Sequence, residues 1–209
     1  MDRVSETLRR HYEQKFQQYG PSSLGVDWGN DKTRQELRYD KMLNIIAHQP
    51  SEVPTVLDVG CGYAGLLQYA NQKGICLKYT GIDVAENMIA YAREAFPAAV
   101  LIAGDILKAS FAQRFQYVVC NGVLTQKLDV PGLVMDAFAS RLIRKLFELC
   151  DKGAAFNVMT TKVNYFSNHL YYRNPAELLS WCMTEITPYV SIDHSYPLFE
   201  FTMYLFRPT

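Results

Sequence analysis

The sequence predicts an α/β fold: a doubly wound, mostly parallel seven-stranded sheet with an antiparallel C-terminal hairpin and an N-terminal helical extension. Three observations predict it. From residue 55 onward, short apolar runs alternate with helical stretches, which is typical of parallel strands joined by helices on both faces of a sheet. Two β-rich runs near the end leave no room for a helix between them, so they should pair antiparallel. The first 50 residues show helical periodicity without strand patterns.

Length and charge limit the possible function classes. The 209 residues correspond to about 1.4 domains of ~150 residues, so we expect a helical extension or lid over 1–50 and one main domain over 51–209. Lys+Arg 21 balance Asp+Glu 21, and a net charge of zero gives no long-range field to attract a nucleic acid. No run approaches the ~18 apolar residues of a membrane span, and the first residues do not resemble a signal peptide. We therefore expect a cytoplasmic monomer or homodimer without membrane contact.

The N-terminal extension is predicted to form two helices. In the first, apolar side chains recur every three to four residues: Val4, Leu8, Tyr12, Phe16 and Tyr19. Gly20 and Pro21 end this helix. The pattern Thr33-x-x-Glu36 is typical of a capping box, and it predicts a second helix from there to about His48. Pro50 and Pro54 mark the boundary to the main domain.

In the main domain, strands and helices are expected in alternation. Strands are predicted over 56–59, 77–82, 99–103, 117–120 and 155–159, and in the closing hairpin over 189–196 and 200–207. Helices are predicted over 66–73, 85–96, 136–151 and 175–183. The first three helices end at Gly74, Pro97 and Gly153, and Pro175 suits the first turn of the fourth.

A glycine-rich turn follows the first of these strands. It reads Gly60-Cys61-Gly62-Tyr63-Ala64-Gly65, which fits G-x-G-x-x-G between a strand and a helix. Gly60 and Gly62 allow the backbone to turn tightly and to approach a ligand without an intervening Cβ. Such turns also occur without a ligand. The neighbouring residues are therefore needed to predict whether this turn binds a ligand, and which one.

Three carboxylates lie at the carboxyl ends of the first three strands of the main domain, at one edge of the sheet. Asp58 would repel a pyrophosphate but suits an ammonium group. Asp83 has the spacing from the glycine turn that suits a partner of ribose hydroxyls. Asp105 can accept a hydrogen bond from an adenine amino group, with Met88 and Ile106 beside the ring. No lysine or arginine lies in the glycine turn, so the expected ligand is adenosine-like, carries a ribose and is cationic.

With these motifs, the chain resembles the class I S-adenosylmethionine-dependent methyltransferases over about residues 55–207. The resemblance rests on residues 56–62, on Gly81-Ile82-Asp83-Val84 before Asn87-Met88, on Gly104-Asp105-Ile106, on a fourth-strand motif over 115–119, and on the reversed last strand of the terminal hairpin. It departs from the family at Ala64, where many members have a third glycine, and at Gln116, where aspartate is frequent. The resemblance implies a Rossmann-like methyltransferase domain over 51–209 with S-adenosyl-L-methionine as cofactor.

The resemblance also implies roles for individual residues. The backbone of Gly60, Cys61 and Gly62 would approach the methionine part of the cofactor, and Asn121 would lie beside the transferable methyl group. The implied cofactor-binding residues of the main domain are Asp58, Gly60, Cys61, Gly62, Asp83, Val84, Met88, Asp105, Ile106 and Asn121. Residues 120–123 lack the Asn/Asp-Pro-Pro-aromatic signature of amino-directed nucleic-acid methyltransferases, which favours a small-molecule acceptor.

The N-terminal extension supplies two further candidates for the cofactor site. Trp28 offers an aromatic face to a sulfonium or a substrate ring, and Arg38 is placed to meet the carboxylate of the cofactor. The competing interpretation is a helical pair packed on the edge of the sheet, with Arg38 in solvent.

The reaction itself requires few catalytic side chains. Methyl transfer by in-line displacement depends mainly on alignment, which supplies ~7–11 kcal/mol, and a general base is needed only for an undissociated acceptor. The sequence shows no catalytic dyad. Its five cysteines form no Cys-x-x-Cys pair, so no metal site is expected. In the loop over 160–173, His169 is a weak candidate for a base and Tyr171 for a wall of the acceptor pocket.

Three alternatives stay open at this point. The acceptor of a methyltransferase could be an RNA or a protein. The glycine turn also fits an NAD-dependent oxidoreductase, although Asp58, Asp105 and the antiparallel tail argue against it. A catalytically silent binding module with the same fold is the third alternative, because fold does not determine function.

Overall fold

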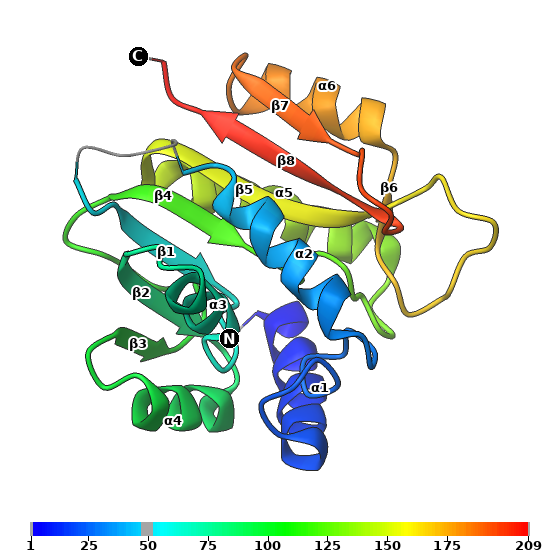
Figure 1. The fold of residues 1–209 in the computed structure, drawn as a ribbon. Coiled ribbons are helices and arrows are strands. Elements are labelled where there is room, and N and C mark those ends of the chain that lie inside the picture. Colours follow the sequence, from blue (N-terminus) through cyan, green and yellow to red (C-terminus); the bar gives the residue numbers. More distant parts are fainter. Residues whose placement is uncertain (1, 47–51, 209) are drawn as a thin grey trace.

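The structure, a computed structural model, describes residues 2–46 and 52–208. A mixed sheet of eight strands forms its centre, with the order β3-β2-β1-β4-β5-β8-β7 (Figure 1). The parallel strands are β1 (Thr55–Val59), β2 (Lys78–Asp83), β3 (Val100–Ala103), β4 (Phe115–Cys120) and β5 (Cys150–Thr160). β8 (Glu200–Phe206) runs antiparallel to β5, and β7 (Val190–Asp193) runs antiparallel to β8. The predicted fold class and the closing hairpin are thereby confirmed.

The helices lie on both faces of this sheet. In Figure 1, α2 (Lys32–Leu43) and α3 (Gly65–Gln72) lie in front of the sheet, and α5 (Gly132–Glu148) and α6 (Pro175–Glu185) lie behind it. α4 (Glu86–Ala95) lies beside β2 and β3, and α1 (Arg3–Tyr19) contacts both α4 and α5. α1 therefore crosses the edge of the sheet at which the parallel strands end.

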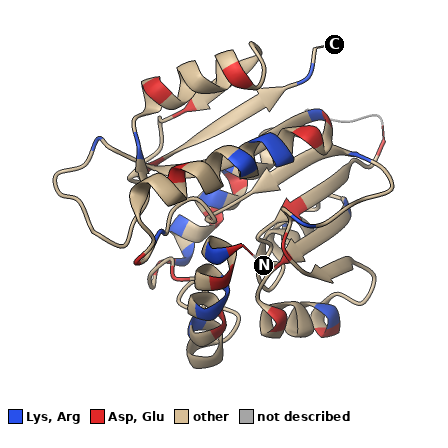
Figure 2. Ribbon diagram, turned by 180° about the vertical axis from the view of Figure 1, so that it is seen from behind, with Lys and Arg blue, Asp and Glu red and all other residues tan. Residues whose placement is uncertain are grey.

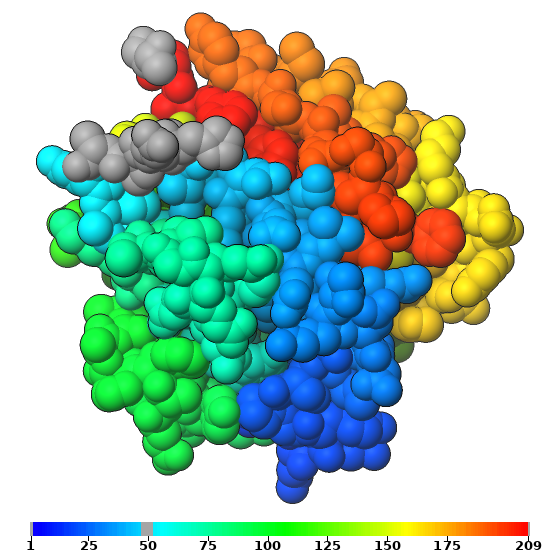
Figure 3. All heavy atoms as spheres, viewed as in Figure 1, coloured from blue at the N-terminus to red at the C-terminus, as the bar shows by residue number. Residues whose placement is uncertain are grey.

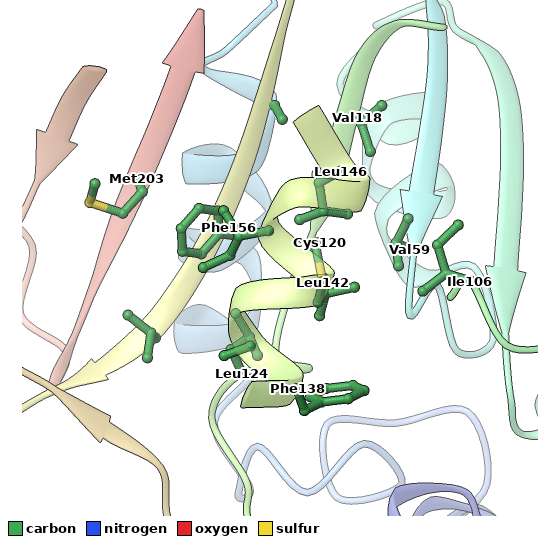
Figure 4. Packing of buried hydrophobic residues seen from close by; sticks show 14 of the residues in the cluster. Val59, Ile106, Val118, Cys120, Leu124, Phe138, Leu142, Leu146, Phe156 and Met203 are labelled. Atoms are coloured by element: carbon green, nitrogen blue, oxygen red, sulfur yellow. The ribbon is translucent and has the colours of Figure 1, made fainter. Parts of the chain in front are cut away.

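The main core lies between the sheet and α5. Leu142 and Leu146 of α5 are fully buried, and they belong to the same apolar cluster as Val118 of β4 and Phe156 of β5 (Figure 4). Burial of each such side chain contributes about 1.5–3 kcal/mol relative to exposure. This packing holds β4 and β5 in place, and the turns at their carboxyl ends are consequently well anchored.

The second helix of the extension differs from the prediction at both ends. Its N-cap is Asp31, whose carboxylate accepts hydrogen bonds from the amides of Thr33 (3.0 Å) and Arg34 (3.3 Å). The capping box expected from Thr33 and Glu36 is therefore wrong, because a carboxylate two residues earlier already binds the free amides. The helix ends at Leu43, and the predicted end near His48 and the boundary residue Pro50 lie outside the described residues.

The boundary between α5 and β5 also differs from the prediction. α5 begins four residues earlier than the expected 136 and ends at Glu148, and β5 begins at Cys150. Gly153 lies inside β5, where a Cβ would be 2.9 Å from the carbonyl oxygen of Leu205 on β8. The apolar residues at 149 and 150 fit a helix face and a buried strand equally well, so periodicity could not separate the two elements. β6 (Tyr172–Arg173), which pairs in parallel with the end of β5, was not expected.

Lys and Arg positions are interspersed with Asp and Glu positions along the ribbons of α1, α5 and α6 (Figure 2). This agrees with the formal net charge of zero. In the described part of the chain, no helix combines the length and the apolar character that crossing a membrane requires.

Candidate functional site

A cavity of about 90 Å³ lies where β1, β2 and β4 end. Ser5, Leu8 and Tyr12 of α1, together with Val26 and Trp28 of the segment over 20–31, cover it. In Figure 3 the blue N-terminal segment lies directly against the green part of the surface that carries α4. The volume of the cavity is smaller than the ~300–1,000 Å³ of typical cofactor sites.

Most of the residues predicted to bind a cofactor line this cavity. They are Trp28, Asp58, Gly60, Cys61, Gly62, Asp83, Val84, Met88, Asp105, Ile106 and Asn121. They come from parts of the chain up to 93 residues apart in sequence, between Trp28 and Asn121, and the parallel sheet brings them to one edge.

The glycine turn has the backbone conformation that its sequence predicts. Gly60 and Gly62 have φ angles of 74° and 53°, which only glycine adopts without strain. A Cβ on Gly60 would overlap the side chain of Val123. Ala64 also has a positive φ of 62°. Gly65 does not, but its missing side chain makes room for the Tyr39 hydroxyl.

The three carboxylates differ in their hydrogen bonds. Asp58 accepts a hydrogen bond from the Tyr79 hydroxyl at 2.7 Å. Asp83 accepts from the backbone amides of Gly62 and Ala85, each at 2.8 Å. Asp105 accepts from the amides of residue 107 (3.0 Å) and residue 2 (3.2 Å), and the second of these contacts joins the start of the chain to the site.

Burial in this cavity makes two of these carboxylates, Asp58 and Asp83, weaker acids. The pKa of Asp58 is raised to about 7, first by burial and then by the charge of Asp83, against the opposing hydrogen bond from Tyr79. Burial also raises the pKa of Asp83, while its backbone hydrogen bonds act in the opposite direction. Two neighbouring buried carboxylates favour a cationic ligand, because a positive charge offsets the free-energy cost of burying each carboxylate and the repulsion between the two.

Asn121 is the polar residue of the cavity that lacks partners. It is 7% exposed, and neither the oxygen nor the nitrogen of its amide has a hydrogen-bond partner among the described residues. An unpaired buried amide is costly, so this side chain points to a ligand group that can donate to it and accept from it.

Three predicted site residues lie outside the cavity. Arg38 forms an ion pair with Glu200, with 2.6 Å between Nε and Oε1. The backbone oxygen of His169 accepts hydrogen bonds from the amides of residues 127 and 128. Tyr171 is buried, and its hydroxyl donates to Asp136 at 2.7 Å. The structure therefore does not bring these three side chains to the cavity.

The sequence analysis missed several residues that line the cavity. They are Ser5, Leu8, Val26, Tyr39, Tyr63, Phe138 and Leu142. Most are apolar positions that a periodic pattern assigns to a helix face, and such a pattern does not distinguish a core contact from a cavity wall. Tyr39 carried a weak signal, because a buried tyrosine needs a partner for its hydroxyl; here Gln35 donates to it at 2.9 Å.

The cavity fits a cationic, ribose-containing nucleoside on three counts. The left-handed glycines leave the backbone beside it free of Cβ atoms, buried carboxylates face it, and the amide of Asn121 is unpaired. Among the described residues no group of three His, Cys, Asp or Glu side chains is arranged to hold a metal ion.

Comparison with known proteins agrees with this geometry. Residues 56–146 match the family described as a methyltransferase domain. A protein of Mycobacterium tuberculosis that bears the name methyltransferase Rv1506c is 29% identical over 151 residues, which make up 71% of this chain and 90% of that protein.

Solved structures with the same fold cover nearly the whole chain. Magnesium protoporphyrin IX methyltransferase from Synechocystis PCC 6803 with bound SAM has a TM-score of 0.70 at 16% identity, over 100% of this chain and 99% of that one. The DhpI-SAM-HEP complex has a TM-score of 0.63 at 14% identity, over 100% of both chains. The [4+2]-cyclase SpnF has a TM-score of 0.65 at 14% identity, over 91% of this chain and 74% of that one. These likenesses show the fold alone, and the cyclase illustrates that one fold supports different reactions.

Proposed function

We propose an acceptor class for this chain, which is a class I S-adenosylmethionine-dependent methyltransferase. In the proposal, the acceptor is a small, uncharged organic molecule. The observation that carries it is the unpaired, buried amide of Asn121 in a cavity with aromatic walls.

The side chains around Asn121 support an uncharged, ring-containing acceptor. The rings of Tyr12, Trp28 and Tyr39 line the cavity together with Asn121. No lysine, arginine or histidine is among the described residues that line it, so nothing there would compensate the charge of a phosphate or carboxylate acceptor. Burial raises the pKa of Tyr12 far above its usual range, so its hydroxyl stays protonated and acts as a neutral hydrogen-bonding group.

The residues proposed to hold the cofactor are those at the ends of the first three strands. The backbone of Gly60 and Gly62 would lie against the methionine part, Asp83 would bind the ribose hydroxyls, and Asp105 would bind the adenine amino group. Asp58 would face the ammonium group. When bound, the cofactor supplies an activated methyl group on a positively charged sulfur.

The chain would contribute mainly by positioning. Asn121 would orient the acceptor through both atoms of its amide, and the aromatic walls would hold its ring. Such alignment supplies about 7–11 kcal/mol. The N-terminal residues over 1–50 would act as a lid that excludes water, because α1 and Trp28 already cover the cavity.

The proposed function is tested by methyl transfer from S-adenosylmethionine with a tritiated methyl group. Uncharged aromatic acceptors, acidic aromatic acceptors, total tRNA and a peptide mixture would be compared under the same conditions. We expect label only in the uncharged small molecules. Transfer to tRNA or peptides would contradict the acceptor class, and tight binding of NADH without binding of S-adenosylmethionine would contradict the methyltransferase function itself.

A further inference from the structure

A series of polar contacts begins at the turn after β4 and crosses the sheet. Gly122 has a φ of 86°, and its amide donates to Oδ1 of Asn157 on β5 at 2.7 Å. The amide nitrogen of Asn157 donates to Oε2 of Glu200 on β8, also at 2.7 Å. Asn157 and Glu200 are 1% and 0% exposed. Asn157 and Glu200 are therefore buried polar side chains, and the residues next to each of them in sequence are apolar.

The series of contacts leads back to the turn after β4 through the N-terminal extension. Glu200 forms the ion pair with Arg38 of α2, and the guanidinium carbon of Arg38 lies 5.1 Å from the ring centroid of Trp28. The ring of Trp28 packs on Gly122, where a Cβ would lie 2.8 Å from Cζ2 of the indole. We call these five residues, Gly122, Asn157, Glu200, Arg38 and Trp28, the contact ring.

Stability alone does not account for a buried ion pair at this place. Desolvation of two charges offsets most of their attraction, and such pairs are often replaced by apolar residues without loss of stability. A pair of this kind can instead specify one local arrangement. Here the arrangement includes Trp28 and the turn that begins with Asn121, which are two walls of the cavity.

We propose that Arg38, Glu200 and Asn157 are positioning residues: they hold the Trp28 indole on Gly122 and thereby fix the wall against which the acceptor lies. The proposal rests on the proposed function, because only an acceptor that reaches Asn121 would use this wall. Arg38, which the sequence analysis offered as a partner for the carboxylate of the cofactor, acts in this proposal through Trp28 instead.

The test uses Trp28 as a spectroscopic reporter. The chain has two tryptophans, so Trp181→Phe leaves Trp28 as the only one. In this background the pair is neutralised in the double variant Arg38→Gln/Glu200→Gln, which leaves no buried charge unpaired. We expect the Stern–Volmer constant for acrylamide quenching of Trp28 to rise about twofold or more, because the cation–π contact that holds the ring is removed. Unchanged quenching would overturn the proposal.

A second ion pair in the chain provides the matched control. Arg144 pairs with Glu185 at 2.6 Å and lies 5.5 Å from the ring of Trp181, at the surface. Arg144→Gln/Glu185→Gln, in the same Trp181→Phe background, should leave the quenching of Trp28 unchanged. An equal rise in this control would overturn the proposal. So would a contact-ring double variant that has lost its far-UV circular dichroism, because the pair would then serve the fold and not the wall.

Calorimetric titration with S-adenosylhomocysteine separates this proposal from the proposed function. The carboxylates proposed to bind ribose and adenine, Asp83 and Asp105, are not members of the contact ring, so the affinity of the contact-ring double variant should stay within about threefold of the wild type. A much larger loss would contradict a local positioning role. Failure of the wild type to bind this molecule would contradict the proposed function, whereas the quenching of Trp28 tests the contact ring without any ligand.

Discussion

At the scale of single residues, Asp83 joins the backbone to the cavity. Its carboxylate accepts hydrogen bonds from the amides of Gly62 and Ala85, and the residue also lines the cavity. A carboxylate oxygen has a second lone pair, so Asp83 can hold the turn and still accept from a ribose hydroxyl.

Asp83→Asn should weaken the binding of S-adenosylhomocysteine by about 1–3 kcal/mol, because one accepting oxygen becomes an NH₂ group that cannot accept from a hydroxyl. Calorimetric titration measures the change. Asp151→Asn is the matched control, since Asp151 is exposed, is the second residue of strand β5 and does not line the cavity. Equal affinities of the Asp83 variant and the control would remove Asp83 from the cofactor site.

Asp58 makes the stability of the ligand-free protein depend on pH. Its pKa is raised from 3.8 to about 7, so the folded state binds more protons than the unfolded state between these two values. The contribution of Asp58 to the free energy of unfolding should therefore be fully present below the lower pKa and should be lost as the pH rises through this window.

Asp58→Asn removes this titration and keeps an oxygen that accepts from Tyr79. Relative to the wild type, the variant should gain about 2–3 kcal/mol in free energy of unfolding between pH 5 and pH 8, at about 1.4 kcal/mol per pKa unit. Urea denaturation at the two pH values measures the difference. A constant difference would show that Asp58 does not titrate in this window.

Whether a site residue could be predicted from the sequence depended on the contacts that hold it in place. Asp58, Asp83 and Asp105 lie at the carboxyl ends of neighbouring parallel strands, and a parallel sheet brings such positions to one edge. Arg38 could not be placed, because its partner Glu200 is 162 residues away in sequence and no periodic pattern connects them. A glutamate within the predicted strand over 200–207 is a signal for a buried partner, but it did not identify that partner.

At the scale of elements, the glycine turn between β1 and α3 is predicted to be specific for the ligand. Gly60 and Gly74 both have positive φ angles, 74° and 71°. A Cβ on Gly60 would overlap Val123, whereas a Cβ on Gly74 would meet nothing within 4 Å. A substitution at either position therefore carries the cost of a positive φ angle, and only the substitution at Gly60 adds a steric clash.

Gly60→Ala should abolish measurable binding of S-adenosylhomocysteine, because the turn has to shift away from Val123. Gly74→Ala should bind normally and lose only about 1 kcal/mol of stability from its left-handed conformation. Calorimetry and thermal unfolding of both variants provide the comparison. Normal binding by the Gly60 variant would show that this turn is not the ligand site.

The elements themselves were largely predictable, and their boundaries were less so. The strand over 56–59 was recognisable because a parallel strand buried on both faces reads as a short, mostly apolar run. The boundary between α5 and β5 was not, because Leu149 and Cys150 satisfy both patterns. The start of α2 was misplaced because Asp31 and Thr33 are both good N-cap residues, and only the structure shows which of them binds the amides.

At the scale of the whole molecule, the balanced charge predicts weak binding to nucleic acids. Lys+Arg 21 and Asp+Glu 21 cancel, and Lys and Arg positions are interspersed with Asp and Glu positions along the ribbons of α1, α5 and α6 in Figure 2. Fluorescence anisotropy with labelled tRNA should show no saturable binding at 150 mM salt, a condition under which even non-specific binders have dissociation constants of about 10⁻⁴–10⁻⁶ M. Saturable, salt-dependent binding in the micromolar range would reopen the alternative of an RNA methyltransferase.

The overall topology was predictable, but the way in which the N-terminal extension closes the cavity was not. Alternation of strands and helices dictates the sheet order within a few possibilities. The position of α1 depends on contacts such as that between the amide of Asp2 and Asp105, 103 residues apart in sequence. Contacts of this kind form only when the whole chain has folded, and the local sequence of α1 does not predict them.

The central claim is that the cavity at the ends of β1, β2 and β4 is the cofactor site. The most direct measurement is a crystal structure of the protein grown with S-adenosylhomocysteine. We expect its ribose at Asp83, its adenine between Met88 and Ile106, and its sulfur near Asn121. Density for the molecule at another place, or a cavity that stays closed by α1 at saturating concentration, would contradict it.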